Sequence, residues 1–114
     1  IPFAPARKLI EQNAIVALAT DYNPGSAPSG NMGLMVSLAS IKMKMTPEEA
    51  LSAATLNAAA AIELSDNFGS IEIGKKANLI LTKSHISSPS FLPYNFGHQP
   101  IKQVFINGKP LPQC

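Results

Sequence analysis

Asp21 is the residue whose type and position in this sequence most favour chemistry. It follows the uncharged apolar run 14–19 after a single threonine, and a Pro-Gly pair comes shortly after it. An apolar run without alternation is typical of a strand buried on both faces of a parallel sheet. Folds of this kind place functional side chains at the carboxyl ends of such strands, where the loops open to solvent. We therefore interpret Asp21 as a candidate functional carboxylate; the alternative is a residue that only begins a turn.

A second group of candidates, Asn23, Gly25 and Ser26, lies in the turn after Asp21. An Asn side chain offers both a donor and an acceptor, and a Gly lets the backbone approach a ligand closely. A Ser hydroxyl and its backbone N–H can hold a carboxylate. Taken alone, however, these residues are more typical of a Pro-Gly turn that closes on its own hydrogen bonds.

Residues 5–10 and 16–26 together resemble the C-terminal part of the imidazolonepropionases, a family of the amidohydrolase superfamily. The similarity runs along nearly the whole chain, and its most specific element is the D-x-N-P-G-S motif of residues 21–26. The resemblance implies hydrolysis of 4-imidazolone-5-propanoate to N-formimino-L-glutamate, in histidine degradation, by metal-activated water. It also implies that Asp21 is a metal ligand and general base at the end of the eighth barrel strand. The positions of Asn23, Gly25 and Ser26 are then expected to contact the substrate or product.

The same resemblance implies one divalent metal ion, zinc or iron, whose remaining ligands lie outside this chain. These enzymes hold the metal with a His-x-His pair and a further histidine, whereas this sequence contains only His85 and His98, well separated. We assign neither as a ligand, because a lone histidine usually has a structural role. The isolated chain is therefore expected to be inactive.

Helices are expected on both sides of the apolar run. Residues 6–12 are predicted to form a short helix that ends at Asn13 in a left-handed cap. A second helix, capped by Asn31 or Ser29, is predicted to continue to about Ile41. Arg7, in the helix predicted at residues 6–12, is a conceivable partner for a substrate carboxylate, although a surface ion pair is the commoner use of such a residue.

Thr46-Pro47-Glu48-Glu49 is a strong signal for the start of a helix. Thr46 is suited to the N-cap and Glu49 to the third position, where the two complete a capping box, and Pro47 suits the first turn. This helix is predicted to run to about Leu64. Thr55 and Asn57, inside it, are interpreted as local hydrogen-bonding partners.

After residue 65 the pattern changes to short strands. Strands are predicted within 69–73, 77–81 and 100–106, with an Asn107-Gly108 hairpin turn and a loop over 84–99 anchored by its aromatic residues. The segment 69–79 resembles the one that leads amidohydrolases into their small β domain. Asn78 stands there in place of the usual aspartate, which is expected to affect a local turn contact.

The predicted fold class is therefore α/β: the C-terminal part of a (β/α)8 barrel, followed by strands of a small β-sandwich domain. The expected boundaries are 1–66 for the barrel segment and 67–114 for the β domain. Because 114 residues starting at Ile1 supply only part of a barrel of roughly 250 residues, we expect a piece of a larger protein.

The composition of the chain argues against nucleic acid and membranes as its binding partners. The net charge is +2 and the nine basic residues are scattered, which argues against nucleic acid. No apolar run is long enough to cross a membrane, and the single cysteine, Cys114, favours a reducing cytoplasm. A small-molecule substrate and a cytoplasmic location are expected.

Two other hypotheses remain open at this point. One is another cyclic amidohydrolase or deaminase of the same superfamily, and the other is a non-catalytic module when the chain is isolated. Unpaired strand edges usually lead to pairing with another copy or to aggregation. We therefore expect a homo-oligomer, such as a dimer, and predict that the isolated chain is not a stable monomer.

Overall fold

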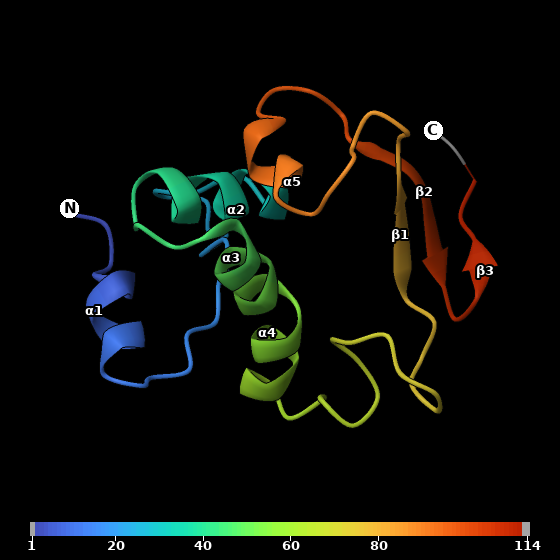
Figure 1. Ribbon diagram of the computed structural model, residues 1–114, viewed down its shortest axis with the longest axis horizontal. Helices are drawn as coiled ribbons and strands as arrows, with labels where there is room; N and C mark the ends of the chain where they lie inside the picture. Colours follow the sequence, from blue (N-terminus) through green and yellow to red (C-terminus); the bar gives the residue numbers. More distant parts are fainter. Residues whose placement is uncertain (1, 113–114) are drawn as a thin grey trace.

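A computed structural model describes residues 2–112 and shows a group of helices beside a small antiparallel sheet (Figure 1). The helical part comprises α1 (Ala6–Glu11), α2 (Met32–Ile41), α3 (Pro47–Ala54) and α4 (Leu56–Ala61). The sheet comprises β1 (Leu79–Thr82), β2 (Ile101–Ile106) and β3 (Lys109–Pro110), and the short helix α5 (Phe91–Tyr94) lies between β1 and β2 in the chain. No helix among residues 2–112 is long and apolar enough to span a membrane.

The predicted helix starts and stops are largely confirmed. Helix α1 is followed by Asn13 with φ of 62°, the left-handed conformation expected of a residue that ends a helix. At α2 the N-cap is Asn31, whose side chain accepts a hydrogen bond from the Leu34 amide at 3.0 Å. At α3 the Thr46 and Glu49 side chains form the complete capping box.

The long helix predicted from Pro47 to Leu64 is wrong, because it breaks at Thr55 and ends at Ala61. Thr55 has φ −123° and ψ −83°, outside the helical region, and its hydroxyl donates to the Leu51 carbonyl at 2.7 Å. Gly69, with φ of 94°, packs against the break so closely that a Cβ there would lie 2.7 Å from the Ala59 Cβ. Contacts from a distant part of the chain therefore accompany the break.

The prediction of a strand buried on both faces at 14–19 is also wrong. The segment belongs to no helix or strand, and Ile15 is 83% exposed, although Val16 and Leu18 pack against the core. A strand is defined by ladder hydrogen bonds to neighbours. No residue among 2–112 offers this segment such a neighbour, so it lies along the helices without a ladder.

The sheet has the order β1-β2-β3, with both pairs antiparallel. The Asn107-Gly108 hairpin turn is confirmed, since both residues have positive φ, at 49° and 76°. Asn78 keeps a turn contact, because its Oδ1 accepts a hydrogen bond from the Asn107 amide at 2.9 Å. The strand predicted at 69–73 is wrong: the segment is irregular and Ile71 is 86% exposed.

The loop over 84–99 is anchored differently from the prediction. It contains α5, whose Pro93 is buried and whose carbonyl accepts a hydrogen bond from the buried Ser37 hydroxyl of α2 at 3.0 Å. The aromatic residues do not anchor it, since Phe91, Tyr94 and Phe96 are all exposed. The loop is therefore anchored by the buried Pro93 and its carbonyl, and not by the aromatic rings that the sequence pattern indicated.

The core is small and made mostly of small side chains. It joins α1, α2 and α3 and consists of Ala6, Val36, Ala39, Met45, Ala50 and Ala53. The exposed surface of the chain is 8297 Å². A folded monomer of 12.1 kDa ordinarily exposes about 6,000 Å². The surplus, much of it apolar, is consistent with a chain whose elements pack against partners beyond the described residues.

Candidate functional site

Asp21 lies at the end of the irregular segment 14–20, at the start of a tight turn. Its backbone is left-handed, with φ of 51°, and its side chain is exposed. Within residues 2–112 the Asp21 carboxylate makes no hydrogen bond or ion pair with another side chain. Both oxygens are therefore available to an external ligand.

Asn23 organises the turn that follows Asp21. Its Oδ1 accepts from the Gly25 amide at 3.0 Å, the Ser26 amide at 2.8 Å and the Ser26 hydroxyl at 3.2 Å. Its Nδ2 donates to the Asp21 carbonyl at 2.6 Å, and its backbone amide donates to the Ala27 carbonyl at 3.0 Å. The structure therefore brings all four predicted site residues into one turn, held by the hydrogen bonds of a single amide side chain.

The backbone before Asp21 is held by the region where α3 and α4 meet. The Leu18 amide donates to the Ala53 carbonyl at 2.9 Å, and the Asn57 Nδ2 donates to the Val16 carbonyl at 2.8 Å. The expectation of local partners is confirmed for Thr55 but wrong for Asn57, whose partner is 41 residues away in the sequence. No feature of the sequence near Asn57 marks a partner that lies 41 residues away.

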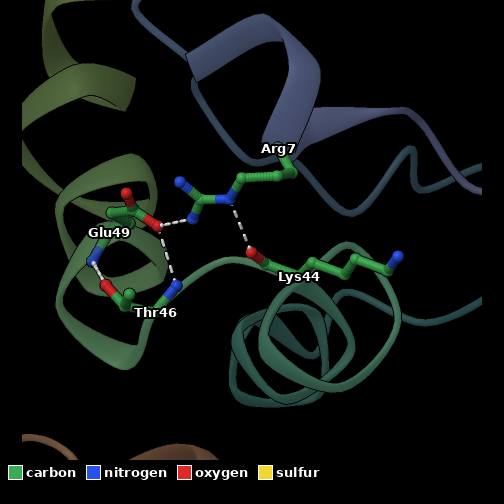
Figure 2. Close-up of polar contacts among 4 residues, drawn as sticks. All are labelled: Arg7, Lys44, Thr46 and Glu49. Atoms are coloured by element: carbon green, nitrogen blue, oxygen red, sulfur yellow. Dashed lines mark hydrogen bonds and ion pairs between the residues drawn. The ribbon is translucent and has the colours of Figure 1, made fainter. Parts of the chain in front are cut away.

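Arg7 makes the ion pair that the sequence analysis favoured for it (Figure 2). Its Nη2 contacts the Glu49 Oε2, and its Nε donates to the Lys44 carbonyl at 3.0 Å. The same Glu49 oxygen accepts from the Thr46 amide at 2.8 Å. Figure 2 shows the guanidinium of α1 reaching across to the start of α3. The pair thus connects two helices and lies apart from the Asp21 turn in the chain.

This contact shifts the pKa of both partners. The hydrogen bond from Arg7, followed by that from the Thr46 backbone, lowers the pKa of the Glu49 carboxyl. The hydrogen bond to Glu49 raises the pKa of Arg7. Both side chains are about one-third exposed, so we interpret the pair as a modest structural link between helices.

The residues described here do not form a complete metal site. Divalent zinc or iron needs several ligands, which in proteins are His, Cys, Asp or Glu side chains. No group of three or more such residues lies close enough together among residues 2–112. His85 and His98 are both exposed, and the free carboxylate of Asp21 fits the role of a single ligand.

Curated relatives are similar to this chain over nearly its whole length. It is 61% identical over 109 residues to the imidazolonepropionase of Christiangramia forsetii, covering 96% of this chain and 26% of that relative. It is 58% identical to the imidazolonepropionase of Flavobacterium johnsoniae, with the same coverage. The chain therefore spans about a quarter of the length of the curated relatives it matches.

Solved structures of related enzymes share the fold. An adenosine deaminase from Xanthomonas campestris, solved with bound zinc, matches 95% of this chain and 28% of its own, with a TM-score of 0.82 and 30% identity. Guanine deaminase of E. coli matches 95% of this chain and 29% of its own, with a TM-score of 0.75 and 19% identity, which supports the fold alone.

A family-wide comparison covers the same extent. The sequence profile described as "Amidohydrolase family" matches residues 3–111. The match includes the helices, the Asp21 turn and the antiparallel sheet. This chain belongs to the amidohydrolase family.

Proposed function

We propose that the chain is the C-terminal part of an imidazolonepropionase, which hydrolyses 4-imidazolone-5-propanoate to N-formimino-L-glutamate in histidine degradation. The observation that carries the proposal is the 61% identity to a protein of that name over 96% of this chain. The geometry agrees with it, because Asp21 is accessible and the turn beside it groups Asn23, Gly25 and Ser26.

In this proposal Asp21 has two roles. Its carboxylate is one ligand of a divalent metal ion, zinc or iron, with the remaining ligands outside this chain. A bound divalent metal lowers the pKa of water towards about 7, which supplies a hydroxide-like nucleophile at neutral pH. The second oxygen of Asp21 then accepts the proton that the water loses as it adds to the ring carbonyl carbon. That proton passes to the ring nitrogen when the C–N bond breaks.

The turn after Asp21 is proposed to hold the substrate. Asn23 uses its Oδ1 and one N–H of Nδ2 inside the turn, which leaves the second Nδ2 hydrogen for a ligand. Gly25 presents backbone without a side chain, and Ser26 is exposed. The Gly25 amide and the Ser26 amide and hydroxyl already donate to the Asn23 Oδ1, so the free Nδ2 hydrogen is the donor that this turn offers to a small anionic group such as the propionate.

The proposal extends to the surroundings of the site. We propose that residues 1–66 complete the end of a (β/α)8 barrel and that 67–114 belong to a small β-sandwich domain. The unpaired segment 14–19 and the surplus of exposed surface support this arrangement. A homodimer and a cytoplasmic location stay predictions from the sequence.

The second candidate is a deaminase or another cyclic amidohydrolase of the same family. It is favoured by the 30% identity to an adenosine deaminase over most of this chain. Both reactions use water on an activated ring carbon, so the choice depends on the ring that binds.

The two candidates are separated by substrate profile. The full-length protein, loaded with zinc or with iron, is assayed on 4-imidazolone-5-propanoate, adenosine and a hydantoin under the same conditions. We expect a preference for the imidazolone of at least about 10³-fold in kcat/KM, because a site that pairs buried polar groups with a substrate discriminates strongly. Turnover of adenosine or hydantoin with no turnover of the imidazolone would reject the proposal in favour of the second candidate.

A further inference from the structure

After the Ala14 amide, which donates to the Leu9 carbonyl of α1 at 2.9 Å, the backbone that leads to Asp21 is attached to the helices by two hydrogen bonds at one place, the break between α3 and α4. One joins the Leu18 amide to the Ala53 carbonyl, and the other joins the Asn57 side chain to the Val16 carbonyl. In an unbroken helix a carbonyl at this position is directed along the axis to the amide four residues later. The break at Thr55 opens it to a partner outside the helix.

We propose that Asn57 is a positioning residue for Asp21. Its side-chain amide, together with the Ala53 carbonyl, fixes the backbone of residues 16–18 and so fixes where the Asp21 carboxylate stands. This inference rests on the proposed function, because it assigns Asn57 to the support of the proposed metal ligand.

Asp21 is held from both sides along the chain. On the upstream side the attachment at Leu18 lies three residues away, and on the downstream side the Asn23 Nδ2 binds the Asp21 carbonyl directly. The downstream attachment is made within an exposed turn, whereas the upstream one connects to helices that contribute to the core. The upstream attachment therefore ties the backbone before Asp21 to the helical part of the fold.

Among residues 2–112, the backbone of 14–19 is bonded to the helices at the Ala14 amide, which donates to the Leu9 carbonyl of α1, and at the two bonds of the α3–α4 break. Asn57 is half-buried. If its side-chain amide were removed, the Val16 carbonyl would lose the one side chain among residues 2–112 that donates a hydrogen bond to it. Residues that orient a metal ligand without touching the metal typically contribute 10–100-fold to metal affinity or activity, as an order of magnitude. We expect an effect of about this size from Asn57.

The test uses two substitutions in the full-length protein. Asn57→Leu removes the donor at similar volume, and Asn57→Asp places an oxygen acceptor against the Val16 carbonyl. The matched control is Asn67→Asp, which makes the same chemical change at an exposed residue whose side chain makes no hydrogen bond within residues 2–112. Zinc affinity is measured by competition with a chromophoric chelator, and kcat, KM and the melting temperature are measured in parallel.

We expect both Asn57 variants to bind zinc about 10–100-fold more weakly and to lose a similar factor in kcat at saturating zinc, with KM changed less than about threefold. The Asn67→Asp control is expected to match the wild type. Folded Asn57 variants with wild-type zinc affinity and kcat would overturn the proposal and leave Asn57 with a purely structural role.

A measurement on the wild type covers the case in which the variants do not fold. Coupling between two sites is reciprocal, so zinc binding at Asp21 must strengthen the attachment that positions it. We expect hydrogen exchange at the Asn57 side-chain amide, which donates to the Val16 carbonyl, to slow by about tenfold or more in zinc-loaded protein relative to metal-free protein. Equal exchange rates would contradict the proposal.

This exchange measurement and the zinc titration do not depend on the substrate. If the wild type fails to hydrolyse the imidazolone, the proposed function fails, while the zinc titration of the variants and the exchange of the Asn57 side-chain amide still decide the role of Asn57.

Discussion

The fit of Gly69 against the start of α4 gives a sharp prediction, because a second glycine provides a matched control. Gly69 and Gly74 have nearly the same positive φ, 94° and 93°. A Cβ at Gly69 would lie 2.7 Å from the Ala59 Cβ and 3.0 Å from the Thr55 carbonyl oxygen, whereas nothing lies within 4 Å of one at Gly74. Alanine is strained at either position by the positive φ, and of the two it collides with a helix at Gly69.

The expected costs follow from these two contributions. A non-glycine residue in a sparsely populated backbone region costs about 1–3 kcal/mol, and both variants bear this term. Forcing an extra methyl group into a packed site adds about 1–3 kcal/mol, and only Gly69→Ala bears that one. We expect Gly69→Ala to be less stable than Gly74→Ala by about 2 kcal/mol.

Urea unfolding of the two full-length variants, followed by circular dichroism, measures this difference. It also reports on the break at Thr55, because the helix must shift to accommodate the methyl group. Equal destabilisation by the two substitutions would refute the packing of Gly69 against α4.

Three further predictions concern the helices and the surface. Thr46→Ala removes the acceptor for the Glu49 amide and is expected to cost about 1 kcal/mol in urea unfolding, whereas Ser52→Ala on the exposed face of α3 should change stability little. Because the Arg7 contact lowers the folded-state pKa of Glu49, its contribution is present above the unfolded pKa and is lost as the pH falls through the folded pKa. Unfolding free energies measured from pH 6 down to pH 3 should therefore fall more steeply for the wild type than for Glu49→Gln, and parallel curves would contradict the pairing. The 114 residues expressed alone should self-associate in analytical ultracentrifugation because of their surplus apolar surface; a monomer with a cooperative melting transition would contradict this.

Local signals in the sequence predicted the parts of the fold that depend on local interactions. The N-caps Asn31 and Thr46, the left-handed Asn13 and the Asn107-Gly108 turn are all where the residue types indicated. In each case the deciding contact lies within a few residues of the signal. The close grouping of Asp21, Asn23, Gly25 and Ser26 follows for the same reason.

The parts that the sequence did not predict depend on distant partners. The apolar run 14–19 and the isoleucines of 69–73 have compositions typical of strands, but a strand also needs a neighbour, and none lies beside them within residues 2–112. The alanine-rich stretch after Pro47 favours an unbroken helix by propensity. Its break at Thr55 coincides with contacts from Leu18 and Gly69, which no local pattern reveals.

The central claim is that the carboxylate of Asp21 holds the metal and accepts a proton in the hydrolysis of 4-imidazolone-5-propanoate. Asp21→Asn in the full-length protein tests it most directly, because asparagine tolerates the left-handed backbone at φ of 51° and should leave folding intact. Single-turnover and steady-state assays at saturating zinc should show kcat reduced by at least about 10²-fold, with an unchanged melting profile of the metal-free protein. A kcat within threefold of the wild type would contradict the claim.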